Sequence, residues 1–247
     1  FGSAPVIEDY SETETSPNVS LVYKPVEWLT TYATYIEGLQ TGGVAPSGTN
    51  NSGQALAPIV SEQYEIGAKA ELGGALFTVA LFDIEKPNTY TNAANFFVQD
   101  GMQHNKGLEF GITGHVTPAL TLVGGVTLLD PVVEGAANAA NDGNRPVDVA
   151  RHLAKLYGEY AIFGVPGLTL TGGAFYTGKQ YTDEANDNTI PSFTTFDLGG
   201  RYRMALGDER ALTLRANLSN LTDEEYWLSS HYLGAPRTLK LSAQLEF

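Results

Sequence analysis

Apolar and polar residues alternate with a period of two in many segments of this chain. In the final segment, one face carries Leu239, Leu241, Ala243, Leu245 and Phe247, and the other carries Lys240, Ser242, Gln244 and Glu246. This alternation predicts a β-strand whose two faces meet different surroundings. The sequence ends on an apolar-face aromatic, Phe247, which is where the aromatic girdle of a membrane interface would lie.

The same pattern recurs along the chain, and from residue 17 onward we expect about eleven strands. The clearest lie at 64–72, 108–113, 155–162, 196–204 and 212–219, and each has a charged face opposite an apolar one. Two segments fit less well. Residues 76–84 are apolar on both faces, and residues 30–36 have no obvious outer side.

The predicted strands are joined alternately by short and by long connectors. The short ones are Pro25-Val26, Gly73-Gly74, Thr117-Pro118, 164–167 and Gly207-Asp208, and the long ones are 38–61, 87–95, 131–148, 183–191 and 221–234. Short and long connectors therefore fall at opposite ends of the sheet. This arrangement is typical of an outer-membrane barrel, which has short periplasmic turns and longer extracellular loops.

Periodicity alone leaves two architectures open. In a β-sandwich the polar faces meet water on the outside, whereas in a membrane barrel they line the lumen and the apolar faces meet lipid. Many segments exceed the 9 to 11 residues that cross a membrane at a tilt, which favours the barrel. We therefore expect an all-β, antiparallel transmembrane β-barrel. Single-chain bacterial barrels have even strand numbers, and eleven is half of about 22.

Composition excludes several classes of function. The formal net charge is -14 with only 14 Lys and Arg, which argues against nucleic acid as a partner. Cysteine is absent, so disulfides, thiolate metal sites and thiol nucleophiles are excluded. No apolar run approaches 18 residues, and a barrel needs none. Residues 1–16 lack a targeting peptide and an initiating Met, so we expect a processed or truncated start.

Four stretches carry a family resemblance. Residues 217–226, followed by 234–238 and the terminal strand, resemble the C-terminal signature of TonB-dependent siderophore receptors. Residues 61–69, 105–110 and 190–198 resemble strands of the same family in the same order. The resemblance covers nearly the whole chain and is weakest in residues 1–16 and in the long loops.

The resemblance implies an outer-membrane receptor for ferric siderophores. Such receptors bind the chelate between loops and an N-terminal plug, and import it with energy transmitted by TonB. No plug or TonB-contacting segment is found, so we expect residues 1–247 to be the C-terminal part of the barrel. Its expected partners are outer-membrane lipid, the missing N-terminal plug and the missing half of the barrel. The alternatives are a passive porin and a soluble β-rich binding domain.

Binding, rather than chemistry, is the expected activity. Iron would arrive inside the external chelate, so no cofactor is expected, and His104, His115, His152 and His231 lack metal-ligand spacing. The candidate ligand-binding aromatics and histidine of the loops and rim are Tyr90, Phe96, Phe97, Tyr181, Tyr226, Trp227, His231 and Tyr232. The alternative role for each of them is interface girdle or loop packing.

Charged residues on the predicted lumen side form a second set of candidates. They are Glu65, Lys69, Glu109, Lys155, Glu159, Arg201, Arg203, Arg215 and Lys240, and they would either pair with the plug or form a wetted channel wall. No enzyme is expected. The carboxylates of 183–184 and 223–225 lie in polar loops, and no Gly-x-Ser-x-Gly elbow is present.

Overall fold

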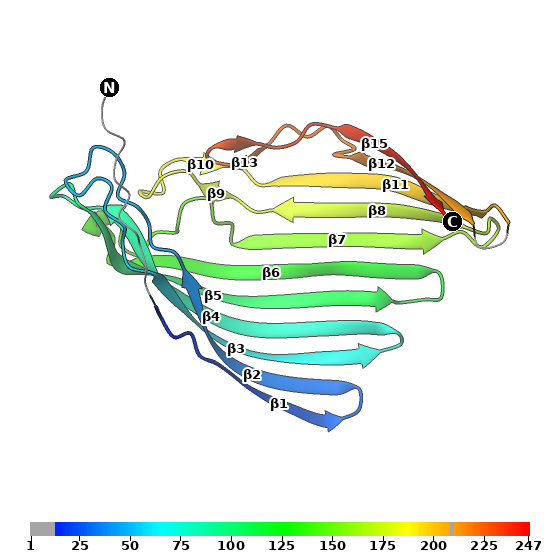
Figure 1. Cartoon of the computed structure of the whole chain (residues 1–247), viewed down its shortest axis with the longest axis horizontal. Helices are drawn as coiled ribbons and strands as arrows, with labels where there is room; N and C mark the ends of the chain where they lie inside the picture. Colours follow the sequence, from blue (N-terminus) through cyan, green and yellow to red (C-terminus); the bar gives the residue numbers. More distant parts are fainter. Residues whose placement is uncertain (1–12, 208–209) are drawn as a thin grey trace.

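The protein is an open, curved, single-layer sheet of eleven antiparallel strands (Figure 1). The computed structural model describes residues 13–207 and 210–247. Strand order follows the chain, β1-β2-β3-β4-β5-β6-β7-β8-β11-β12-β15, so the sheet is a meander whose edges are β1 and β15. The all-β fold class and the eleven strands predicted from the sequence are confirmed.

The strands of the sheet are long. They are β1 (Asn18–Val26), β2 (Leu29–Gln40), β3 (Ile59–Leu72), β4 (Ala75–Thr91), β5 (Phe97–His115), β6 (Leu120–Glu134), β7 (His152–Ala161), β8 (Leu168–Thr177), β11 (Phe193–Ala205), β12 (Ala211–Ser219) and β15 (Thr238–Glu246). Two small hairpins lie in loops: β9 (Gln180–Tyr181) with β10 (Thr189–Ile190), and β13 (Trp227–Ser229) with β14 (Tyr232–Leu233). One 3-10 turn, η1, spans Ala139–Asn141. Across the described ranges, no helix has the length and hydropathy to cross a bilayer.

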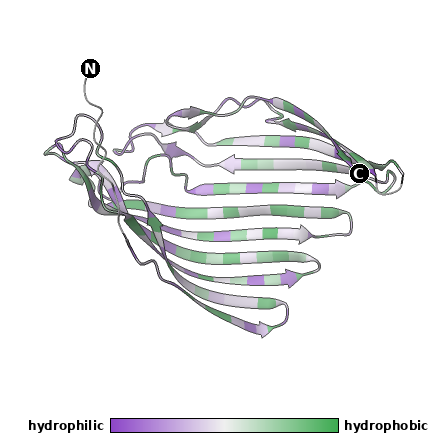
Figure 2. Cartoon of the chain, viewed as in Figure 1, coloured by the Kyte–Doolittle hydropathy of each residue, from purple (hydrophilic) through white to green (hydrophobic). Residues whose placement is uncertain are grey.

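Register assigns every strand residue to one of two faces, because residues directly opposite each other in an antiparallel pair share a face. Val126 of β6 opposes Phe110 of β5 and Ala154 of β7, and these three residues belong to the outer face. Thr127 opposes Glu109 on the other side of the sheet, which we call the inner face. Figure 2 shows the resulting bands of apolar and polar residues along the strands.

The outer face has no second layer against it. Leu198, Leu214 and Leu241 lie on this face and are 53%, 41% and 71% exposed. In a sandwich these side chains would be buried in a shared core. An apolar surface that extends across a whole sheet is instead the surface that a barrel presents to lipid. The sandwich alternative is therefore wrong.

Within the described residues, short and long connections lie at opposite ends of the strands, as the sequence predicted (Figure 1). Asp208 of the predicted connector Gly207-Asp208 lies outside the described residues. Gly73 and Gly74 have φ angles of 60° and 92°, the left-handed pair that a type I′ hairpin turn requires. One short connector was predicted incorrectly: Pro25 and Val26 belong to β1, and the turn is Glu27-Trp28. Because β1 is an edge strand with a register shift between Tyr23 and Val26, it tolerates the missing amide of Pro25.

Two strands continue through prolines that the sequence analysis assigned to loops. β4 runs to Thr91, and a register shift between Pro87 and Thr89 accommodates Pro87. β6 runs through Pro131 to Glu134. The amides of Leu129 and Val133, on either side of Pro131, bond to carbonyls of the following loop, beyond the end of the β7 ladder, so a proline between them interrupts no strand pairing.

The two segments that fitted the alternation poorly pack large inner-face side chains over glycines. The Phe82 ring covers Gly107, where an added Cβ would lie 2.2 Å from the ring. The Tyr32 ring covers Gly67 in the same way, and its hydroxyl donates to Glu65 at 2.6 Å. Apolar residues on the inner side of β4 and β2 therefore fill space left by glycine on the neighbouring strand.

Candidate functional site

The long connections form two hydrogen-bonded groups at one end of the sheet. In the first, loop 41–58 is joined to the β4–β5 connection. Asn50 donates its amide to the carbonyl of Asn95 at 2.7 Å, and the Asn51 side chain exchanges two hydrogen bonds with the backbone of Phe97. Phe97 also packs against Gly43. The structure thus brings Phe96 and Phe97, two candidate ligand residues, into this group.

The second group joins loops 135–151, 178–192 and 220–237. The Asn186 side chain exchanges hydrogen bonds with the backbone of Arg145, both at 2.9 Å. Asp148, which has a φ of 61°, donates its amide to the carbonyl of Tyr181 at 2.9 Å. Its carboxylate accepts from the amide and the hydroxyl of Ser230, both at 2.7 Å. These contacts fix three loops relative to one another.

Tyr181 lies between two cations in this second group. The Arg145 guanidinium carbon is 4.3 Å from the centre of the Tyr181 ring, and Lys179 Nζ is 4.8 Å from it. Lys179 also approaches the Tyr181 hydroxyl at 3.4 Å. Hydrogen bonding from Arg145 stabilises the phenolate most, and hydrogen bonding from Lys179 adds to it. Together they lower the pKa of Tyr181 below its ordinary value.

A cavity of about 220 Å³ lies beside Arg145, against the inner wall of the sheet. Asn88, Tyr90, Gln103 and Val133 line it from β4, β5 and β6, and loop residues that include Arg145 and Glu184 line its other side. Arg145, Lys179 and Tyr181 form what we call the Tyr181 cluster. Tyr90 therefore lies in the same region as this cluster, as a rim aromatic should if it contacts a ligand. Sequence reasoning missed Arg145 and Lys179 because it searched the loops for aromatics.

The remaining ligand candidates lie in loop 220–237. Trp227 and Tyr232 are exposed at 49% and 69%, on the β13–β14 hairpin. Tyr226 stacks on Phe193 with ring centroids 4.1 Å apart, and its ring also covers Gly234. This gives Tyr226 the packing role that the sequence analysis kept as its alternative. Contact with a ligand stays a prediction for all of these residues.

Ser230 contacts both His231 and Asp148, but the three residues do not form a catalytic triad. Ser230 Oγ lies 2.7 Å from both Asp148 Oδ2 and His231 Nδ1. A serine hydroxyl has one proton, which it donates to the carboxylate, so His231 Nδ1 has to carry the proton of the second hydrogen bond. In a triad the histidine is central and accepts the serine proton. Here the serine is central, and its function is to join loops.

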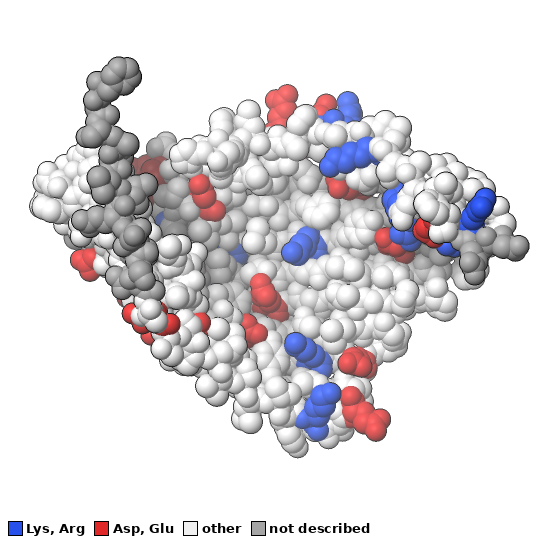
Figure 3. All heavy atoms as spheres, viewed as in Figure 1, with Lys and Arg blue, Asp and Glu red and all other residues white. Residues whose placement is uncertain are grey.

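All of the candidate plug-facing charges lie on the inner face, as register requires. Figure 3 shows the hollowed side of the molecule, with charged side chains spread across it. Several are paired within the wall: Arg201 with Glu159 at 2.9 Å, Arg203 with Glu246 at 2.9 Å, Arg215 with Gln244 at 3.0 Å, and Glu109 with Thr127 at 3.0 Å. Lys69 Nζ lies 5.2 Å from the Tyr32 ring centre, and Glu65 accepts from the Tyr32 hydroxyl. Across the described parts of the chain, Lys155 and Lys240 have no ion pair.

A belt of charges crosses the outer face near the loop end. Asp83, Glu85 and His104 each place one potential ligand atom within 4.8 Å of the others. These carboxylates already have side-chain partners: His104 is 3.2 Å from Glu85 and 3.4 Å from Glu134, and Lys106 is 3.4 Å from Asp83. We interpret the belt as ion pairing at the polar level of the lipid. The absence of a protein-built metal site stays a prediction.

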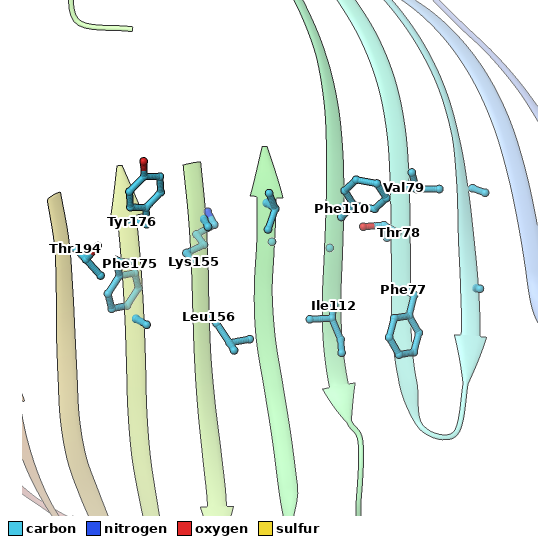
Figure 4. A pocket seen from close by; sticks show the side chains of 17 residues that line it. Phe77, Thr78, Val79, Phe110, Ile112, Lys155, Leu156, Phe175, Tyr176 and Thr194 are labelled. Carbon is cyan, nitrogen blue, oxygen red and sulfur yellow. The ribbon is translucent and has the colours of Figure 1, made fainter. Parts of the chain in front are cut away.

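Below this belt, the outer face is apolar and hollowed. A shallow groove crosses neighbouring strands, and Figure 4 shows Phe77, Phe110, Ile112 and Leu156 along it. Small residues such as Ala68, Ala154 and Ala174 line it as well. Its surface is almost entirely apolar, which suits acyl chains and offers nothing to orient a polar ligand. The ligand site is therefore to be sought on the inner side and in the loops.

Acid should loosen the turn that follows Tyr181. The Asp183 carboxylate accepts from the amides of Asp187 at 3.0 Å and Asn188 at 2.7 Å, and these hydrogen bonds lower the pKa of Asp183 below 3.8. A lowered pKa gives stability that is present above the unfolded-state value and is lost as the pH falls through the folded-state value. We expect the Asp187 and Asn188 amide resonances to shift in NMR spectra with a midpoint below the ordinary pKa of an aspartate. Titration of Asp183 at or above its ordinary pKa would contradict this.

Comparison with known proteins gives a family. The family model described as "TonB dependent receptor-like, beta-barrel" matches residues 2–221. The chain is 39% identical over 244 residues to the ferrichrome receptor FcuA of Yersinia enterocolitica, and this alignment covers 94% of this chain and 32% of that protein. It is 29% identical over 231 residues to the ferrichrome outer membrane transporter/phage receptor of Escherichia coli (strain K12), covering 89% of this chain and 30% of that protein.

A solved structure has the same fold. BauA, the ferric preacinetobactin receptor from Acinetobacter baumannii, superposes with a TM-score of 0.81 at 37% identity, covering 94% of this chain and 36% of that one. The chain thus spans about a third of the length of the relatives that it matches.

Proposed function

This chain belongs to the TonB-dependent receptor family, and on that premise we propose that it is part of a receptor that takes up ferric siderophores with energy from TonB. Barrels of this family lie in the outer membrane of Gram-negative bacteria, and so does this chain. The observation that carries the proposal is a single-layer sheet with an apolar outer face, a charged inner face and all of its long loops at one end.

In this proposal, residues 1–247 form the C-terminal part of the barrel. The open edges β1 and β15 would pair with the rest of a barrel of about 22 strands, because lipid cannot satisfy unpaired backbone groups. The inner-face charges would face a plug, which would contact TonB. Iron would travel inside the chelate, so the wall needs no resident metal or cofactor.

Transport, rather than catalysis, is the activity that this family is known for. The arrangement of Ser230 between Asp148 and His231 does not support a hydrolase, because the serine and not the histidine is central. A passive porin is the competing function. It shares the apolar outer face and the polar lumen, but it works by diffusion and needs no energy from TonB. Dependence on TonB therefore separates the two functions.

Deleting the gene that encodes this chain should abolish growth on at least one ferric chelate when other iron is withheld. Disrupting TonB should abolish the same growth, and supplying the gene on a plasmid should restore it only in the strain with intact TonB. The measurement is growth on a panel of iron chelates, with free ferrous iron as the control that all strains use. Growth that needs the gene but not TonB would support the porin, and unchanged growth on every chelate would contradict the uptake function.

A further inference from the structure

The long loops are acidic, and their cations divide into two kinds. Loops 41–58, 92–96, 135–151, 178–192 and 220–237 contain eight Asp and Glu but only four Lys and Arg, namely Arg145, Arg151, Lys179 and Arg237. Arg151 pairs with Asp130, and Arg237 pairs with Asp223 at 3.4 Å. Within the described residues, Arg145 and Lys179 form no ion pair with a carboxylate. These two unpaired cations are the ones gathered at Tyr181.

The backbone holds the Tyr181 cluster in place. The Tyr181 carbonyl accepts from Asp148, which is itself anchored to Ser230, and the neighbouring Gln180 is 4% exposed and pairs with Ile190. Two like charges held at one ring repel each other, and contact with the ring offsets only part of that repulsion. A bound anion would offset the rest. A planar guanidinium also stacks on flat aromatic groups, such as those of aryl chelators.

We propose that Arg145, Tyr181 and Lys179 form the part of the ligand site that selects ferric chelates with a net negative charge over neutral ones. This inference rests on the proposed function and adds the charge class of the substrate. The eight acidic residues, all in loops 135–151, 178–192 and 220–237, repel an anionic chelate, whereas this cluster within the same loops attracts and positions it. The adjoining cavity, with Tyr90 and Gln103 on its wall, lies where the rest of the chelate would contact the inner face.

The test compares two ferric chelates of similar size, a triply negative tris-catecholate and a neutral tris-hydroxamate. Binding is measured on the whole receptor that contains this chain, in outer membranes of a strain without other ferric receptors. The variant R145Q/K179Q removes the two unpaired cations. The matched control R151Q/R237Q removes two paired cations from the same loops. The amount of folded receptor in the membrane is measured for each.

We expect R145Q/K179Q to weaken binding of the anionic chelate by roughly tenfold or more, the effect of losing charge-assisted contacts. Its affinity for the neutral chelate should stay within about twofold, and R151Q/R237Q should change neither affinity by more than that. Equal losses for both chelates, or wild-type preference for the neutral one, would overturn the charge selection and leave the proposed function standing. If the wild-type receptor bound no ferric chelate of any charge, the proposed function would fail and the selectivity with it.

Discussion

Replacing Val126 with arginine should destabilise the folded barrel by about 2–4 kcal/mol, the cost of a cation near the bilayer midplane on the lipid side of a strand. Val126 lies on the outer face, opposite Phe110 and Ala154, and it lines the apolar groove of Figure 4. It is six positions along β6 from the strand's first residue, Leu120, at the tight-turn end. An arginine there has no counter-charge within the apolar band.

The neighbouring position provides the control. Thr127 lies on the inner face, where it donates to Glu109 at 3.0 Å. Arginine at this position would face a polar interior and find a carboxylate, so T127R should assemble nearly as well as the wild type. The measurement is the yield of heat-modifiable, folded receptor in outer membranes, followed by denaturant unfolding in lipid. Equal losses from V126R and T127R would mean that both faces meet similar surroundings, which contradicts the assignment of the outer face to lipid.

The face assignment was predictable because it depends only on local periodicity. Each strand of an antiparallel sheet turns alternate side chains to one side, so Leu198 and Leu214 could be placed on one face and Arg201 and Arg215 on the other before any register was known. The tight turns followed from residues with special backbone preferences, such as Gly73 and Gly74. These features need no knowledge of distant contacts.

Strand ends were less predictable, since they depend on the length and the pairing register of the neighbouring strand. Proline is read as a breaker, yet Pro131 lies in β6 at a position where β7 has already ended and no ladder bond is lost. Pro87 is accommodated by a register shift in its pairing with β5. A local pattern contains no information about the length of the partner strand.

The loop cluster could not be predicted either. Arg145 and Tyr181 lie in different loops, and they meet only because Asn186 and Asp148 join those loops by hydrogen bonds. The sequence did indicate Tyr181 as a rim aromatic. It did not indicate which of the four loop cations would be left without a carboxylate, because ion pairing such as that of Arg151 with Asp130 joins residues 21 positions apart in the sequence.

Two of the stretches that identified the family are joined through Asn220. Asn220 donates its amide to Asp197 at 3.0 Å and its side-chain amide to the carbonyls of Glu224 at 2.9 Å and Ala235 at 3.0 Å, and it accepts from the Glu224 amide at 2.9 Å. The residue is 4% exposed and has a φ of 51°. Asparagine tolerates this left-handed conformation better than most residues, and its side chain makes three of these four hydrogen bonds.

N220A should therefore destabilise the protein by about 3 kcal/mol or more, because the three hydrogen bonds of the buried Asn220 side chain are lost and alanine is strained at positive φ. N220G loses the same side-chain hydrogen bonds without the backbone strain, so it should be more stable than N220A by roughly 1–2 kcal/mol. Denaturant unfolding in lipid measures both. If N220A and N220G were equally destabilised, strain would contribute nothing. If both resembled the wild type, the side-chain hydrogen bonds from Asn220 to Glu224 and Ala235 would contribute nothing to the stability of the terminal hairpin.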